Sequence, residues 1–159
     1  MLDLNQVAPN SELPTLDGSS AQLYPKDGKL SLITFYKFSC PTCQLTLPYI
    51  QKIYDAYGDV VNIAVVAQDG PEKTSEFARQ YNITMPILLD QDPYPVSRQH
   101  GLVSVPTIFL VNPDGTIRYA GEGFVKQELL NLSDVLAEKS SKPQIDLFGN
   151  DNVPEIKPG

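Results

Sequence analysis

Two cysteines separated by two residues are the side chains of this sequence best suited to covalent chemistry. They are Cys40 and Cys43, in the segment Cys40-Pro41-Thr42-Cys43, and the chain has no other cysteine. Cysteines at positions i and i+3 of a helix lie about one turn apart, within the ~4.4–6.8 Å between Cα atoms that a disulfide allows. The spacing therefore predicts a pair of thiols that can form and open a disulfide reversibly.

The residues on either side predict that this pair lies between a strand and a helix. Residues 30–38 are rich in strand formers and almost continuously apolar, as in a central strand covered on both faces. From Pro41 onward, apolar residues recur with helical spacing as far as Gly58, a typical helix end. Cys40 is therefore expected at the helix N-terminus, where unpaired N–H groups and the helix dipole stabilise a thiolate.

This placement predicts different roles for the two thiols. The Cys40 thiolate would attack a partner disulfide and form a mixed disulfide. Cys43, one turn further into the helix and shielded from solvent, would then displace the partner by attacking the sulfur of Cys40. We therefore predict a thiol-disulfide oxidoreductase with Cys40 and Cys43 as its catalytic residues, and with their redox-active disulfide in place of a cofactor.

Other uses of these residues remain open. A zinc site would need about four ligands, and beyond the two cysteines the chain offers only His100 and carboxylates. A permanent structural disulfide would close so short a loop that it would stabilise the fold little. His100 precedes Gly101 and is expected to end a short helix rather than to act as a general base. We predict no metal site.

A second motif, Val105-Pro106-Thr107, stands immediately before the apolar segment 108–111. An X-Pro bond that opens a strand can be cis, and nearby backbone groups would then be free to pair with an extended substrate peptide. The alternative is that Pro106 merely begins an edge of the sheet. Six residues are predicted to contact substrate, Tyr36 as part of an apolar rim: Val105, Pro106, Thr107, Tyr36, Pro41 and Thr42.

The rest of the chain alternates strands with helices. Further strands are expected at 60–67, 86–90 and 107–111, and further helices at 71–81, 95–100 and 125–139. The turn Asn112-Pro113-Asp114-Gly115 predicts a hairpin that adds a strand at 116–120. Alternating strands and helices followed by an antiparallel pair imply an α/β fold, with a central mixed sheet flanked by helices on both faces.

Size and charge restrict the organisation of the chain and its partners. The chain has 159 residues, 42% of them hydrophobic, which suits one compact domain with a core. We expect the domain at residues 1–139 and a docked or flexible C-terminal tail at 140–159. The net charge of −7 disfavours nucleic acid and anionic lipid as partners. A monomer without a membrane span is expected.

The start of the sequence has neither a basic n-region nor an apolar h-region. As written, the sequence therefore predicts a cytoplasmic location. If a leader has been removed, a periplasmic or extracytoplasmic location is the expectation instead.

Taken together, the motifs resemble the thioredoxin superfamily, and within it the redoxin branch of TlpA- and ResA-type thiol-disulfide oxidoreductases, related to AhpC/TSA proteins. The resemblance covers about residues 7–139. It is carried by Ala8-Pro9-Asn10, Leu16-Asp17-Gly18, the segment from Phe35 to Cys43, Leu47-Pro48, Val105-Pro106-Thr107 and Asn112-Pro113-Asp114-Gly115.

This resemblance implies a thioredoxin-like fold with an N-terminal extension and a β-α insert at about residues 69–95. It also implies Cys40 as nucleophile, Cys43 as resolving cysteine and Pro106 as a cis-proline beside them. The expected partners are protein or small-molecule disulfides and an upstream thiol reductant. Ser39 stands where such proteins usually carry Trp. Their usual buried acid has no assigned counterpart, although Asp69 and Glu72 lie in the right region.

Peroxiredoxins share this fold, so a thiol peroxidase is the main alternative function. Their signature, Pro-x-x-x-Thr-x-x-Cys, does not fit the sequence. With Cys40 as the peroxidatic residue, the Pro and Thr positions hold Ile33 and Lys37, and with Cys43 they hold Tyr36 and Cys40. A binding module that has kept the fold and lost turnover is a third possibility.

Overall fold

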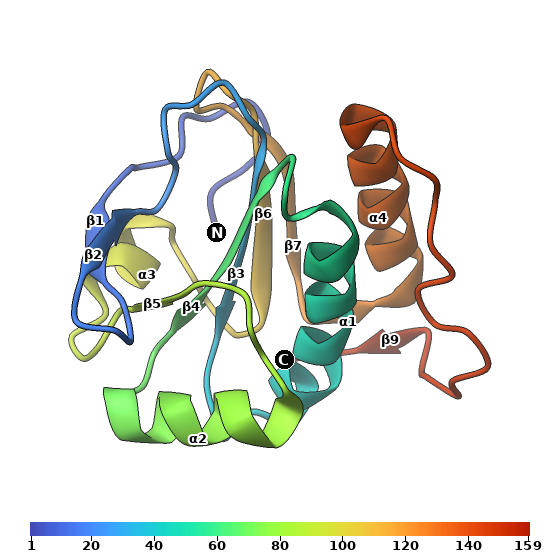
Figure 1. Ribbon diagram of the computed structural model, residues 1–159. Helices are drawn as coiled ribbons and strands as arrows, with labels where there is room; N and C mark the ends of the chain where they lie inside the picture. Colours follow the sequence, from blue (N-terminus) through green and yellow to red (C-terminus); the bar gives the residue numbers. More distant parts are fainter.

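A five-stranded mixed sheet forms the centre of the structure (Figure 1), a computed structural model that describes residues 1–159. Neighbouring strands are parallel from β5 to β3 and antiparallel from β3 to β7. The strand order is β5 (Ile87–Leu89), β4 (Asn62–Ala67), β3 (Ser31–Tyr36), β6 (Thr107–Val111) and β7 (Ile117–Glu122). The predicted mixed sheet is confirmed.

Helices cover both faces of this sheet, as predicted. The helix α1 (Pro41–Tyr57) and the helix α4 (Lys126–Ser140) pack side by side on one face, and α2 (Pro71–Tyr81) crosses the end of the sheet beside them. The short helix α3 (Pro95–Gln99) lies on the other face (Figure 1). None of the helices combines the length and apolarity that a membrane-spanning segment needs.

The central strand β3 separates two hydrophobic clusters. All six of its residues are buried. Leu32 and Tyr36 belong to the larger cluster, which α1 and α4 cover, whereas Ile33 and Phe35 belong to the smaller cluster beneath α3. This alternation follows from the two-residue period of a strand, and it explains why a strand buried on both faces reads as a continuous apolar run.

The first thirty residues form the predicted N-terminal extension. Strands β1 (Glu12–Pro14) and β2 (Ser20–Gln22) make an antiparallel hairpin. Leu13, Leu23 and Tyr24 are buried in the smaller cluster, so the extension covers the face of the sheet that α3 leaves open.

Three strands, β3, β4 and β5, are shorter than predicted, and hydrogen bonds explain the larger differences at β3 and β4. β3 ends at Tyr36 rather than at residue 38, because the Phe38 N–H turns away to donate to the Asp69 carboxylate at 2.7 Å. β4 begins at Asn62 rather than at residue 60, because the N–H groups of Val60 and Val61 both donate to the Tyr57 carbonyl at the end of α1.

Residues 140–159 fold back onto the domain. Leu147 and Phe148 are buried in the larger cluster. Near the end of the chain, β9 (Ile156–Lys157) pairs antiparallel with β8 (Phe124–Val125), a two-residue strand between β7 and α4. Figure 1 shows that this brings the C-terminus close to the first turn of α1.

Candidate active site

Cys40 caps the N-terminus of α1. Its backbone is extended, with φ −87° and ψ 115°, and Pro41 opens the helix. The Cys40 sulfur accepts a hydrogen bond from the Cys43 backbone N–H at 3.1 Å. The sulfur thus takes the place of an N-cap oxygen at the positive end of the helix dipole.

Cys43 lies one turn further along α1, within the core. Its side chain has no exposed surface, whereas Cys40 is only partly buried, and both thiols are free. Burial raises the pKa of the Cys43 thiol well above its usual range, and the neighbouring Cys40 and Asp69 raise it further. The pair therefore combines one accessible thiol with one shielded thiol.

The loop that contains Pro106 lies against Cys40. The Val105-Pro106 peptide bond is cis. The Cys40 thiol donates to the Val105 carbonyl oxygen, with the two heavy atoms 3.4 Å apart. The Gly123 N–H donates to the Pro106 carbonyl at 2.8 Å and so fixes the other side of the loop. The cysteine segment follows β3, and the proline loop precedes β6. The two motifs meet because β3 and β6 are neighbours in the sheet.

The two threonines among the predicted contact residues have their hydroxyl groups engaged within the chain. Thr107 is fully buried and donates to the Ser104 carbonyl at 2.7 Å. Thr42 is nearly buried and donates to the Pro158 carbonyl at 2.6 Å. Pro106 is also buried, so the accessible surface beside Cys40 comes from Pro41, which is exposed, and from Val105, which is partly so.

The prediction that Tyr36 forms an apolar rim is wrong. Its side chain has no exposed surface and packs against Phe77 of α2, with the ring centroids 5.0 Å apart. Tyr36 is the last residue of β3 and shares the face of Leu32, so its ring points into the larger cluster rather than toward a partner. Phe38, two residues later, is only partly buried.

Asp69 is one of the two acidic residues to which the sequence analysis assigned no role. It lies two residues after the end of β4, and its carboxylate accepts the Phe38 N–H at 2.7 Å, which places it beside the loop leading to Cys40. Glu72 lies in the first turn of α2 and is exposed. The available signal was that β3 and β4 are parallel, because the residues that follow two parallel neighbours emerge at the same edge of a sheet.

His100 lies outside this site. It ends α3, as predicted, and is fully buried between the aromatic rings of Phe35 and Phe109. Its Nδ1 is 2.8 Å from the Val96 carbonyl, and its Nε2 is 2.8 Å from the Tyr24 hydroxyl. Because a carbonyl only accepts, Nδ1 carries the proton and Nε2 accepts from Tyr24, which is the pattern of a neutral imidazole.

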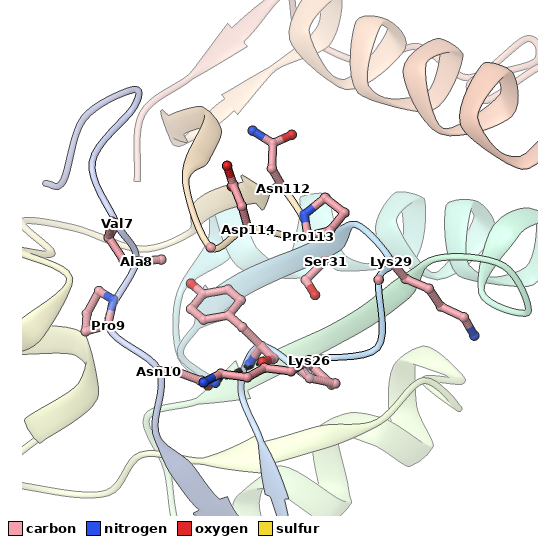
Figure 2. A pocket seen from close by; sticks show the side chains of 14 residues that line it. Val7, Ala8, Pro9, Asn10, Lys26, Lys29, Ser31, Asn112, Pro113 and Asp114 are labelled. Atoms are coloured by element: carbon pink, nitrogen blue, oxygen red, sulfur yellow. Dashed lines mark hydrogen bonds between the residues drawn. The ribbon is translucent and has the colours of Figure 1, made fainter.

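A cavity beside the N-terminal segment lies far from the cysteines. Figure 2 shows this cavity of about 610 Å³, lined by the N-terminal segment around Ala8, by Lys26 and Ser31, and by the hairpin turn around Pro113. Ser31 begins β3, whereas the cysteines follow its other end. Five strand steps of ~3.3 Å separate the two ends by roughly 16 Å, so the cavity is not part of the cysteine site.

The residues gathered at the end of β3 suit sulfur chemistry. No group of three or more His, Cys, Asp or Glu side chains is arranged to hold a metal ion. An accessible thiol that caps a helix, a shielded thiol one turn later and a cis-proline loop beside both define a thiol-disulfide exchange site on a thioredoxin-like fold.

Known proteins place the chain in the same class. The AhpC/TSA family model matches residues 4–120, and the chain belongs to this family. The thiol-disulfide oxidoreductase ResA of Halalkalibacterium halodurans is 30% identical over 127 residues, which are 79% of this chain and 72% of that protein. The thioredoxin-like protein YneN of Bacillus subtilis is 29% identical over 71% of this chain and 68% of its own length.

A solved structure extends the similarity to three dimensions. The thioredoxin domain of a thiol-disulfide oxidoreductase from Bacteroides vulgatus superposes with a TM-score of 0.76 at 27% identity, covering 85% of this chain and 98% of that one. The chain is therefore a thiol-disulfide oxidoreductase of the thioredoxin type, with the thioredoxin-like fold that its motifs predicted.

Proposed function

We propose that the chain exchanges disulfides with protein and small-molecule partners through Cys40 as nucleophile and Cys43 as resolving cysteine. The observation that carries the proposal is the position of the Cys40 sulfur. This sulfur is partly exposed, 3.1 Å from the Cys43 N–H and 3.4 Å from the Val105 carbonyl oxygen. It is thus stabilised as an anion on one side and close to the backbone of the proline loop on the other.

Reduction of a partner disulfide follows in two steps. The Cys40 thiolate attacks one sulfur of the partner, the partner S–S bond breaks, and a mixed disulfide forms while the other partner sulfur leaves as a thiolate. Cys43 then loses its proton and attacks the Cys40 sulfur, which releases the second partner sulfur. The partner gains two electrons and two protons, and the chain is left with a Cys40–Cys43 disulfide. An external dithiol reductant restores both thiols.

The backbone beside Cys40 supplies the surface for a polypeptide partner. Val105 precedes β6 and lies outside the ladder between β6 and β7, which begins at Thr107. Its carbonyl and N–H are therefore placed to pair with an extended segment that carries the partner cysteine. Val105 and Pro41 line this surface in our proposal, and the buried Pro106 connects Val105 to β6. Electron transfer needs no further cofactor, because the cysteine pair itself carries the electrons, and one chain holds the complete site as a monomer.

The test compares the wild type with Cys40→Ser and Cys43→Ser. Insulin-disulfide reduction by dithiothreitol is measured together with a glutathione redox titration of the pair. Cys40→Ser should abolish turnover, and Cys43→Ser should accumulate a mixed disulfide detectable by mass spectrometry. Equal activity of all three proteins would exclude the proposed roles.

Hydrogen peroxide provides the control for the alternative activity. Because no Thr and Pro stand at the peroxidatic positions, the reduced chain should consume peroxide far more slowly than it reduces insulin. Faster peroxide consumption would favour a thiol peroxidase.

Labelling of Cys40 with a membrane-impermeant maleimide in intact cells distinguishes a cytoplasmic from a periplasmic location.

A further inference from the structure

The end of the C-terminal tail lies on the backbone that surrounds Cys40. The Pro158 carbonyl accepts the Thr42 hydroxyl, inside the cysteine segment, at 2.6 Å. Gly159 lies so close to the Val105 carbonyl that a Cβ atom at residue 159 would overlap it. The tail also approaches Gly123, where a Cβ would lie 2.8 Å from the Lys157 carbonyl oxygen.

The tail is firmly attached over its first part. Leu147 and Phe148 are buried in the larger cluster, and Phe148 stacks near Tyr49 of α1 with the ring centroids 4.6 Å apart. The Tyr49 hydroxyl donates to the Asp151 carboxylate at 2.8 Å, and the Lys52 amine donates to the Leu147 carbonyl at 2.7 Å. Residues 147–151 are therefore an anchor that holds the segment after them next to α1.

The last residues of the tail are held much more weakly. Residues 154–159 are all exposed, and the Ile156 side chain is 67% exposed. Their attachments are a two-residue strand pairing, a hydrogen bond from the Lys126 N–H to the Glu155 carbonyl at 2.9 Å, the Thr42 hydrogen bond and a Lys126–Glu155 ion pair at 3.9 Å, in which the Glu155 side chain is 81% exposed. An exposed ion pair adds little stability, and a short exposed strand belongs to the parts of a protein that open locally.

A polypeptide substrate and the tail need the same backbone. An extended segment that pairs with the backbone at Val105 would enter the space that Gly159 occupies, and beyond it β9 already pairs with Phe124 and Val125. Both cannot pair with this edge at once. A small disulfide needs only the sulfur of Cys40, which stays partly exposed with the tail in place.

We propose that residues 155–159 determine which substrates reach Cys40, by acting as a built-in competitor for the polypeptide-binding edge. This inference rests on the proposed function and adds a selection step to it. Small disulfides react while the tail is docked, whereas a polypeptide must first displace β9, and the anchor at Phe148 returns the tail to its place afterwards.

The first experiment removes residues 155–159 and retains the anchor. If the tail covers the edge in nine molecules of ten, its removal raises the apparent affinity for a polypeptide about tenfold. The kcat/KM for insulin should therefore rise about tenfold, while the value for glutathione disulfide stays unchanged within the error of the assay. Asn152→Ala, an exposed change just before the weakly held segment, is the matched control and should behave as the wild type toward both substrates.

A second arm returns the tail as a separate peptide. A synthetic peptide of residues 153–159 should inhibit insulin reduction by the shortened chain at millimolar concentration, and it should leave glutathione disulfide reduction untouched. A scrambled peptide should not inhibit. If shortening changes the kcat/KM for insulin and for glutathione disulfide by the same factor, or changes neither, the inference is overturned. The roles of Cys40 and Cys43 would still stand, since they are tested separately by Cys40→Ser.

A third measurement does not depend on the shortened chain being folded. In Cys43→Ser trapped as a mixed disulfide with a cysteine-containing peptide, amide hydrogen exchange at Ile156 and Lys157 should be faster than in the mixed disulfide with glutathione. Equal exchange in the two trapped forms would mean that the tail stays docked while a polypeptide is bound, and the inference would fail.

Discussion

The two thiols of the pair differ in their access to solvent. Cys40 is partly exposed at the mouth of α1, whereas Cys43 is fully buried and burial raises its pKa. Iodoacetamide at neutral pH should therefore alkylate the reduced chain once, at Cys40, because the reagent needs an accessible thiolate. Peptide mapping by mass spectrometry measures the site.

The Cys40→Ser variant is the control for this alkylation. It should stay unmodified under the conditions that label the wild type completely. Modification of Cys43 at a rate comparable to that of Cys40 would mean that the interior of the site opens to solvent.

His100 makes stability depend on pH. Burial lowers its pKa, against the smaller opposing effects of the Val96 hydrogen bond and the Asp90 charge. Between the lowered pKa of the folded chain and about 6.5 in the unfolded chain, the unfolded state binds more protons. Stability is thus fully present above about pH 6.5 and falls as the pH drops, by up to about 1.4 kcal/mol per pH unit.

Urea unfolding at a series of pH values measures this effect. His100→Gln keeps a polar group next to the Tyr24 hydroxyl but does not titrate, so it should be less stable at pH 7.5 and should lose the slope between pH 6.5 and 5. If the variant keeps the wild-type dependence of unfolding free energy on pH, groups other than His100 cause that dependence.

At the scale of the elements, the beginning of the tail is part of the core rather than an appendage. Phe148 is 5% exposed and packs against Tyr49 of α1 and against Phe124 of β8. Phe148→Ala should therefore lower the free energy of unfolding by about 3–5 kcal/mol, the usual cost of removing a buried aromatic ring. Denaturant unfolding followed by circular dichroism measures it.

Ile156→Ala is the matched control on the same tail. With a side chain that is 67% exposed, it should change the unfolding free energy by no more than about 0.5 kcal/mol. A small effect of Phe148→Ala would mean that the tail is dispensable for the fold.

Elements with a strong local signal were predictable from the sequence. The predicted helix at 71–81 coincides with α2, because Pro71 begins it and Asn82 ends it with φ +55°. The strand at 107–111 coincides with β6, where the cis-proline and a turn bound an apolar run. The cysteine pair was equally readable, since its spacing and its place after β3 are properties of the sequence alone.

Features that depend on tertiary contacts could not be predicted from the sequence in the same way. Tyr36 and Phe38 look alike beside the cysteines, and only the end of β3 decides that the first points inward. Asp69 meets Phe38 across two strands. The tail has scattered prolines and no periodicity, and its docking depends on two apolar residues, Leu147 and Phe148, that are buried in the larger cluster, with Phe148 beside Tyr49 of α1.

At the scale of the whole molecule, the cysteine site lies beyond one end of the sheet, and the hydrophobic clusters that stabilise the fold lie on the two faces of the sheet. The cysteines and Asp69 emerge beyond the ends of the parallel strands β3 and β4, and the larger cluster beneath α1 and α4 holds the helix end in place. The smaller cluster and the N-terminal hairpin cover the opposite face. The site thus lies at one edge of a rigid sheet, where its geometry is fixed while Cys40 stays accessible.

The net charge of the whole molecule also affects how a charged partner approaches. The net charge of −7 gives the molecule as a whole a negative potential, which salt screens over about 10 Å at 0.1 M. A basic disulfide-containing polypeptide should be reduced faster at low salt, and raising the salt to 0.5 M should lower its kcat/KM by roughly threefold to tenfold. An acidic polypeptide should show the opposite trend, because the potential repels it, and an uncharged small disulfide should show none. Matched peptides with the same cysteine loop and different flanking charges measure all three trends, and a common salt dependence would rule out steering by the net charge.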